Sequence, residues 1–222
     1  GSGNICEKCL GGDFSHCVKN KCIKGNTLMS VLSKHEAEYI RKRKWYDQVD
    51  LFICPSEFYR KKLTEGNFTK SPIVTLRNPL PLDTVFERNE TNEGYILYFG
   101  RLSPEKGVKT LIEAAIKCGC HLIILGTGPQ EEELKELAKD AENIEFKGFQ
   151  TGEALHKFVK NSKCVVLPSE WYENGPYSAM EAMALGTPVV STPSDGMTDL
   201  LDDGVNGYLT DDDAVMAEKL LA

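Results

Sequence analysis

The sequence predicts an α/β fold in which helices cover both faces of a parallel sheet, and two observations support this prediction. From residue 95 onward, short runs rich in β-branched residues alternate with segments of helical periodicity. Such alternation forms βαβ units, whose crossover connections make the strands parallel and place the helices on the faces. The chain also has 222 residues, of which 41% are hydrophobic and 27% charged. This length and composition are typical of a globular protein that buries a substantial core.

Each strand and helix of this region has its own signal. The expected strands are short apolar runs that end near Gly, Pro, Ser or Thr: YILYFG (95–100), HLIILG (121–126), NIEFKGF (143–149), CVVLPS (164–169) and TPVVST (187–192). The expected helices carry apolar residues at helical spacing: VKTLIEAAIKC (108–118), QEEELKELAKD (130–140), TGEALHKFVKNS (151–162) and YSAMEAMALG (177–186).

The N-terminal part predicts a smaller set of elements. Apolar residues at helical spacing predict a helix over 27–46, and VDLFICPS (49–56) and PIVTL (72–76) predict strands, with Ser56 capping a helix between them. The Pro-rich, polar segment that follows predicts a linker. We therefore expect four parts, namely a cysteine-rich segment, a short N-terminal part, an interdomain linker and a C-terminal domain truncated at its end: 1–26, 27–78, 79–93 and 94–222.

Charge is distributed unevenly along the chain, whose net charge is −7. Residues 1–78 carry 14 Lys and Arg against 8 Asp and Glu, whereas residues 79–222 carry 12 against 25. The acidic domain argues against a nucleic-acid partner. The run RKRK (41–44) has two interpretations, a solvated helix face or a contact with anionic lipid headgroups. No apolar run approaches the ~20 residues that span a bilayer.

The eight cysteines fall into two groups. Four lie in or beside apolar runs and are expected to be small buried hydrophobes: Cys54, Cys118, Cys120 and Cys164. The other four, spaced C-x2-C-x7-C-x4-C, could hold a structural Zn²⁺ with tetrahedral geometry: Cys6, Cys9, Cys17 and Cys22. Two disulfides or four reduced thiols fit the same spacing, and His16 is an alternative ligand.

The loop after the first strand of the C-terminal part is a candidate anion site. Gly100 permits a tight turn, and Arg101 and Lys106 then place two cations ahead of a helix that begins near Val108. Ligands bind at the carboxyl ends of strands in such sheets, and cations at a helix start attract phosphate. The turn GTGP (126–129) would let a ligand's base approach the backbone.

The stretch YENGPYSAME (172–181) places two carboxylates around a helix start. Pro176 suits the first position of the helix, with Asn174 or Gly175 as its cap. The amides of the next residues would be free for phosphate or sugar oxygens: Tyr177, Ser178 and Ala179. Glu181, inside the helix, could accept hydrogen bonds from the paired hydroxyls of a ribose. The alternative interpretation makes Glu173 a loop charge or cap and Glu181 a solvent-facing helix residue.

Residues from about 49 to 210 resemble the retaining, nucleotide-sugar-dependent glycosyltransferases of the GT-B fold, family 4 (group 1). The resemblance rests on motifs in the family's order and spacing: FGRLSPEKG, LIILGTGP, NIEFKGF, VVLPSEWYENGPYSAMEAMALGTPVVST and DDGVNGYL. Glu173 and Glu181 match the family's E-x7-E motif. The resemblance implies a Rossmann-like C-terminal domain of a GT-B fold plus part of the N-terminal, acceptor-binding domain.

The resemblance also implies a role for each matching residue. Arg101 and Lys106 match the pair that grips the donor diphosphate and stabilises the leaving nucleoside diphosphate. Glu181 matches the residue bound to the donor ribose, and Glu173 the residue near the transferred sugar. These implied roles make Arg101, Lys106 and Glu173 catalytic. The other donor-binding positions act mainly through the backbone: Gly100, Phe149, Asn174, Gly175, Pro176, Tyr177 and Ser178.

The implied reaction transfers a sugar from a nucleoside-diphosphate sugar to a polysaccharide or lipid-linked glycan, with retention at the anomeric carbon. No cofactor is expected for catalysis, since Arg101 and Lys106 supply the charge that Mg²⁺ would. The expected location is the cytoplasm, with peripheral contact at the inner face of the cell membrane through the basic N-terminal part. Two alternatives stay open: a nucleotide-sugar epimerase of the same fold, and a non-catalytic, metal-stapled binding module.

The chain departs from the family pattern in two respects. SDGMTDLL (194–201) has Asp195 and Asp199 where the family has Gly and Glu. The glycine-rich loop and the histidine of the family's first domain have no counterpart. We therefore expect a fragment that binds donor weakly and is inactive alone.

Overall fold

The computed structural model describes residues 5–80, 91–194 and 196–210. The chain forms two compact units, Gly1–Arg77 and Asn78–Ala222, called here the N-terminal unit and the C-terminal unit. Most of the expected linker (residues 81–90) and the C-terminal residues 211–222, where truncation was expected, lie outside the described residues. The functional assignment of the four expected parts stays a prediction.

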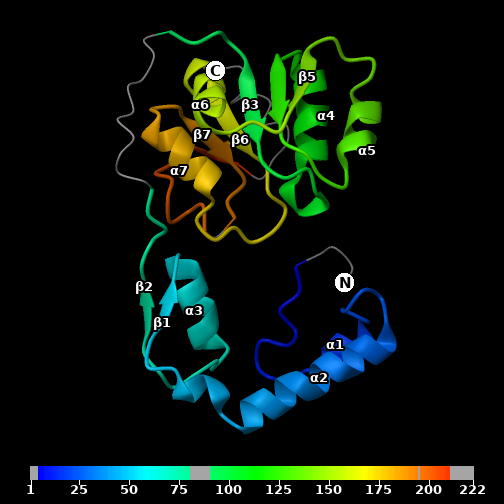
Figure 1. The fold of residues 1–222 in the computed structure, drawn as a ribbon, viewed down its shortest axis with the longest axis vertical. Helices are drawn as coiled ribbons and strands as arrows, with labels where there is room; N and C mark the ends of the chain where they lie inside the picture. Colours follow the sequence, from blue (N-terminus) through cyan, green and yellow to red (C-terminus); the bar gives the residue numbers. More distant parts are fainter. Residues whose placement is uncertain (1–4, 81–90, 195, 211–222) are drawn as a thin grey trace. The chain divides into compact units, whose positions relative to one another are not determined.

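The N-terminal unit begins with two helices, α1 (Ser15–Lys19) and α2 (Thr27–Lys42) (Figure 1). The side chain of Asn26 caps α2 by accepting a hydrogen bond of 3.1 Å from the Met29 amide. The prediction that this helix continues to residue 46 is wrong. Lys44 adopts a left-handed conformation with φ 53°, which ends the helical path, and a 3₁₀ turn, η1 (Trp45–Gln48), follows.

The same unit contains a small parallel sheet. β1 (Phe52–Cys54) pairs with β2 (Ile73–Thr75), and α3 (Glu57–Glu65) connects them. The Ser56 hydroxyl caps α3 by accepting from the Tyr59 amide at 3.3 Å. Both predicted strands and the predicted cap are confirmed.

Six parallel strands form the sheet of the C-terminal unit, in the order β5-β4-β3-β6-β7-β8. Their bounds are β3 (Ile96–Phe99), β4 (Leu122–Leu125), β5 (Ile144–Gly148), β6 (Cys164–Leu167), β7 (Val189–Ser191) and β8 (Gly207–Leu209). The first five were predicted. β8 was not, because its short sequence GYL has no apolar run of its own and becomes a strand by pairing with β7.

Helices cover both faces of this sheet, which confirms the predicted fold class. α4 (Val108–Cys118) and α5 (Glu131–Leu137) cover one face, and α6 (Gly152–Asn161) and α7 (Tyr177–Ala184) cover the other (Figure 1). In β3, Ile96 and Tyr98 point into the core beneath α4 and α5, while Leu97 and Phe99 point into the core beneath α6 and α7. This alternation is the period of two that a strand imposes on its side chains.

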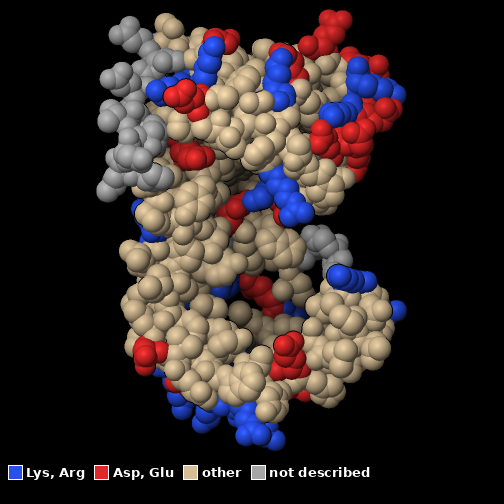
Figure 2. All heavy atoms as spheres, viewed as in Figure 1, with Lys and Arg blue, Asp and Glu red and all other residues tan. Residues whose placement is uncertain are grey.

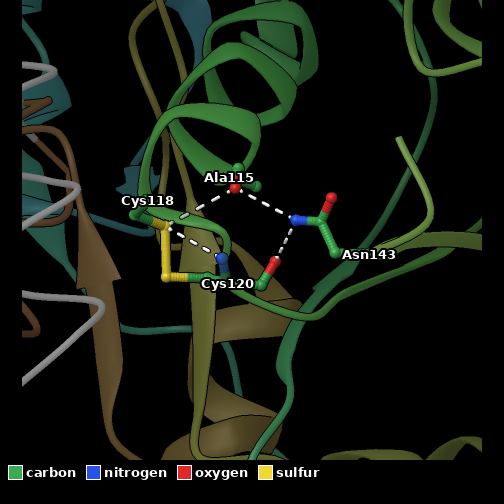
Figure 3. Close-up of a disulfide and its surroundings, with 4 residues drawn as sticks. All are labelled: Ala115, Cys118, Cys120 and Asn143. Carbon is green, nitrogen blue, oxygen red and sulfur yellow. Dashed lines mark hydrogen bonds between the residues drawn. A yellow bond between two sulfur atoms is a disulfide. The ribbon is translucent and has the colours of Figure 1, made fainter. Parts of the chain in front are cut away.

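The prediction that Cys118 and Cys120 are small buried hydrophobes is wrong. The two residues form a disulfide at the end of α4 (Figure 3) and are only partly buried. The side-chain amide of Asn143 donates to the carbonyls of Ala115 and Cys120, at 3.1 and 2.7 Å. Asn143 directly precedes β5, so this residue also fixes the turn that contains the disulfide. Cys54 and Cys164 are buried thiols, as expected.

Candidate functional site

The loops that follow β3 and β6 lie at the point where the strand order of the sheet reverses. The chain runs outward from β3 to β4 and β5, and then returns to place β6 on the other side of β3. In open parallel sheets this reversal creates a crevice at the carboxyl ends of the strands, where ligands bind. Residues 100–107 and 168–176 therefore form the candidate site.

These two loops are joined by close backbone contacts. The Glu170 amide donates to the Glu105 carbonyl at 3.0 Å, and the Thr110 hydroxyl donates to the Glu170 carboxylate at 3.3 Å. Gly107 has φ +64°, and a Cβ at this position would lie 1.9 Å from the Pro168 carbonyl oxygen. Only glycine fits both the conformation and the space. The first loop, which contains the turn η2 (Pro104–Lys106), is thus fixed against the second.

Two of the predicted residues meet between these loops. The Lys106 ammonium lies 2.7 Å from Oε1 of Glu173, and the Ser169 hydroxyl donates a hydrogen bond to the same oxygen. Glu173 is only 9% exposed. Because a carboxylate removed from water needs a charge partner and hydrogen bonds, the cation and the hydroxyl stabilise Glu173 in its position.

Tyr98 fixes the turn that carries Arg101. Tyr98 lies near the end of β3, and its hydroxyl donates a hydrogen bond of 2.8 Å to the Arg101 carbonyl. Burial raises the pKa of Tyr98, and the negative charges of Glu173 and Glu105 raise it further. The phenol therefore remains a hydrogen-bond donor throughout the physiological pH range.

The segment after Glu173 is held from two sides. A Cβ on Gly196 would lie 1.9 Å from the Glu173 carbonyl oxygen, so the backbone approaches here as closely as glycine permits. The side-chain amide of Asn78 donates to the Gly175 carbonyl at 3.2 Å. The backbone around Glu173 is therefore confined by residues distant in sequence. Asp195, the family departure beside Gly196, lies outside the described residues.

The helix start predicted at Pro176 is shifted by one residue. Pro176 is the N-cap, with extended ψ of 132°, and α7 begins at Tyr177, so neither Asn174 nor Gly175 is the cap. The Ala179 amide is also not free, because it donates to the Pro176 carbonyl at 3.1 Å. In the described part of the chain, no hydrogen bond occupies the amides of Tyr177 and Ser178. These two amides remain available to a ligand.

A cavity of about 540 Å³ lies at the carboxyl ends of β3, β4 and β5. Arg101 and the GTGP turn line it, together with Phe149, whose side chain is 70% exposed. Gly128 cannot carry a side chain here, because its Cβ would lie 2.2 Å from the Leu102 carbonyl oxygen. The volume and the exposed backbone suit a flat ring system such as a nucleobase.

Glu181 lies on α7 and is half-buried, which disagrees with the interpretation as a solvent-facing residue. Burial raises its pKa, and the nearby His156 on α6 partly offsets this effect. Among the described residues, no hydrogen bond or ion pair joins Glu181 to Lys106 or Glu173.

The ionic groups of the candidate site were predicted from the sequence, whereas the residues that hold them were not. Ser169, Tyr98 and Gly196 were not predicted as site residues. A signal was present for Ser169, a polar residue that directly follows the buried strand run CVVLP. Tyr98 reads as a core residue, and the close approach of Gly196 to Glu173 is visible only in the folded chain.

The four N-terminal cysteines are not joined by disulfides in the structure: Cys6, Cys9, Cys17 and Cys22. Burial raises the pKa of Cys9 and Cys17, and the negative charge of neighbouring thiolates of the segment raises it further. Within the residues that the structure describes, no three side chains of ligating type are arranged to hold a metal ion. Structural zinc thus stays a prediction, which elemental analysis of the purified chain would test.

The fold defines the class, an α/β domain of the GT-B type, and its topological switch point carries the candidate site. The family model "Glycosyl transferases group 1" matches residues 83–221. The chain belongs to this glycosyltransferase family.

Curated relatives agree with the family. An uncharacterised glycosyltransferase of Methanocaldococcus jannaschii is 36% identical over 53% of this chain and 32% of its own length. The alpha-D-kanosaminyltransferase of Streptomyces kanamyceticus is 31% identical over 63% of this chain and 41% of its own length. The amylovoran biosynthesis glycosyltransferase AmsK of Erwinia amylovora is 31% identical over 81% of this chain and 47% of its own length. The chain thus spans about a third to a half of the length of these relatives.

Solved structures confirm the fold. The structure of HepE of Anabaena in complex with UDP-glucose matches with a TM-score of 0.71 at 20% identity. The match covers 89% of this chain and 58% of the HepE chain. The lipopolysaccharide outer core galactosyltransferase WaaB has a TM-score of 0.66 at 24% identity, covering 78% of this chain and 52% of its own.

Proposed function

We propose that the protein transfers a sugar from a nucleoside-diphosphate sugar to a glycan acceptor, with retention of configuration. The observation that carries this proposal is the joining of Lys106 and Glu173 at the switch point of the sheet, beside a cavity that suits a nucleobase. A site with a cation for phosphate and a buried carboxylate for hydroxyls matches the diphosphate and the sugar of such a donor. The proposed acceptor is a polysaccharide or a lipid-linked glycan, which the named products of several relatives support.

The proposed binding mode places the donor along the carboxyl ends of the strands. The base enters the cavity beside Phe149, and the ribose hydroxyls donate to Glu181. Arg101 and Lys106 bind the diphosphate, together with the free amides at the start of α7. Glu173 accepts a hydrogen bond from the transferred sugar. As the bond to the sugar breaks, negative charge grows on the leaving diphosphate, and fixed cations and amides stabilise it without metal assistance.

We further propose that the N-terminal unit is part of an acceptor-binding domain. Its two-stranded parallel sheet has exposed apolar residues, Ile53 and Val74, whereas parallel sheets are normally covered on both faces. The relatives are two to three times as long as the matched region, so they have room for the rest of such a domain. On this proposal, transfer requires the longer protein.

The basic end of α2 supports the proposed peripheral membrane contact. Exposed Lys42, Arg43 and Lys44 lie beside the exposed rings of Tyr39 and Trp45, which meet edge to face at 5.5 Å. Figure 2 shows Lys and Arg gathered at this end of the N-terminal unit. Cations with amphipathic rings suit an anionic headgroup layer, here at the cytoplasmic face. In the described part of the chain, none of the helices combines the length and apolar character needed to span a bilayer.

Nucleoside diphosphates should raise the melting temperature of the purified chain. A ligand at 100 times its Kd stabilises the native state by about 2.7 kcal/mol. We expect one of UDP, GDP, ADP or dTDP to produce the largest shift, and its nucleoside to produce a much smaller one. Arg101→Ala should reduce the shift. If no diphosphate shifts the transition, the donor site is wrong. NMR of the product formed by the longer protein would decide retention.

Donor binding should weaken on acidification because of Glu181. Burial raises its pKa, so it becomes protonated at a higher pH than an exposed glutamate and then accepts hydrogen bonds less well. Between about pH 7 and pH 5, affinity for the binding diphosphate should fall more steeply in the native chain than in Glu181→Gln. Calorimetry across this pH range measures the diphosphate affinity of the native chain and of Glu181→Gln. Glu113→Gln, an exposed change on α4, is the control, and equal slopes for all three proteins would refute the role of Glu181.

The two alternative functions receive no support from the comparisons. An epimerase of the same fold would use the same cavity but would not require an acceptor, so product analysis separates it. A metal-stapled binding module would carry stoichiometric zinc and bind no nucleotide. The family match places the chain among transferases.

A further inference from the structure

Ser169 is a buried serine, 6% exposed, that lies just after β6. Its hydroxyl donates to Oε1 of Glu173, four residues later in the chain. A buried hydroxyl that donates to a carboxylate forms a stronger bond than a neutral pair. This bond links the end of a rigid strand to the carboxylate of the site.

The backbone of Ser169 is itself anchored to the neighbouring strand. The Thr192 hydroxyl, just after β7, donates to the Ser169 carbonyl at 2.6 Å. One residue earlier, the buried Ser191 hydroxyl donates to the Leu167 carbonyl at 2.8 Å. Two hydroxyls of β7 and its loop therefore hold the end of β6, and the position of Ser169 follows from the sheet.

The two partners of Glu173 use the same oxygen. Lys106 and Ser169 both bond to Oε1, and in the described part of the chain Oε2 has no hydrogen-bond partner. The carboxylate is thus held at one oxygen, and the other remains available to a hydroxyl. Lys106 would not stay bonded to Glu173 when a donor binds, because the donor diphosphate would attract the same ammonium.

We infer that Ser169 is a positioning residue, which keeps the Glu173 carboxylate in place for the donor sugar when Lys106 turns to the diphosphate. The inference rests on the proposed function for the identity of the ligand. That Ser169 fixes the Glu173 carboxylate does not depend on the ligand and rests on the hydrogen bonds of Ser169 to Glu173 and Thr192. Ser169 itself touches no part of the donor in this scheme.

The test compares Ser169→Ala with Ser162→Ala, another buried serine whose hydroxyl bonds to a carbonyl, that of Val159, at the end of α6. Calorimetry measures the affinities for UDP and UDP-glucose, and for GDP and GDP-mannose. Ser169→Ala should lower the affinity for the nucleotide sugar relative to the diphosphate by about tenfold, the value of one hydrogen bond to a charged group. Affinity for the diphosphate alone should stay within about twofold. Ser162→Ala should change neither.

If Ser169 only stabilised the fold, Ser169→Ala would lower the affinities for the diphosphate and the nucleotide sugar by the same factor. That result would overturn the inference. Thr192→Val, which removes only the anchor of the Ser169 carbonyl, should shift the same ratio in the same direction by a smaller factor. An unchanged ratio in both variants would equally overturn it.

A crystal structure of the double variant Lys106→Ala with Ser169→Ala, compared with that of Lys106→Ala, separates this inference from the proposed function, because without Lys106 only Ser169 holds the carboxylate. If no nucleotide binds the native chain, the proposed function fails, and the position of Glu173 in the double variant still decides the inference. A displaced or disordered carboxylate supports it, and an unmoved carboxylate refutes it.

Discussion

Gly196→Ala should cause a large loss of sugar transfer by the longer protein while the fold survives. The new Cβ would lie 1.9 Å from the Glu173 carbonyl oxygen and 2.6 Å from its carbon, both backbone atoms that cannot rotate away. Overpacking of this kind costs about 1–3 kcal/mol of stability. The loop must move by roughly 1 Å, and a displacement of that size at a reacting site can cost about 100-fold in rate. Chemical denaturation and transfer by the longer protein measure the two effects.

The matched control is Gly11→Ala. Gly11 has no positive φ, and a Cβ there would meet nothing within 4 Å. This variant should keep native stability and activity. If Gly196→Ala behaves in the same way, the backbone around Glu173 is not confined as the structure indicates, and the role of Gly196 in positioning it is refuted.

Lys106→Ala should weaken diphosphate binding by about 10- to 100-fold, the value of one hydrogen bond between charged groups. It should also destabilise the free protein, because the buried Glu173 carboxylate loses the ammonium at 2.7 Å and retains only Ser169. Calorimetry measures the first effect and denaturation the second. Lys117→Ala, an exposed lysine in the last turn of α4, is the control and should change neither.

A double-mutant cycle separates the two roles of Lys106. Once Glu173→Gln has removed the carboxylate charge, Lys106→Ala should cost less stability, and we expect a coupling of about 1–2 kcal/mol. The loss of diphosphate affinity should persist in the double variant, because it arises from the phosphate contact. Additive stability effects would show that the ion pair contributes nothing to the fold.

The sequence predicted the sheet well because its signals are local. Five strands are short apolar runs, and their helices carry apolar residues at the period that faces a sheet. The elements that were missed or wrongly predicted depend on backbone conformation and pairing that these local signals do not report. β8 depends on pairing with β7, α2 ends where Lys44 turns left-handed, and the Cys118–Cys120 disulfide requires a turn that brings the two thiols together.

The sequence of this protein determined its class and the chemical inventory of its site. Alternating apolar runs and helical segments predicted the α/β sheet. The charged residues of its loops predicted Arg101, Lys106 and Glu173 as site residues. Tertiary structure alone decided how these groups are held: the pairing of Lys106 with Glu173, the hydroxyl of Ser169 and the close approach of Gly196. The physical reason is distance along the chain. Periodicity and motifs report interactions between near neighbours, whereas a buried carboxylate is stabilised by groups that only folding brings together.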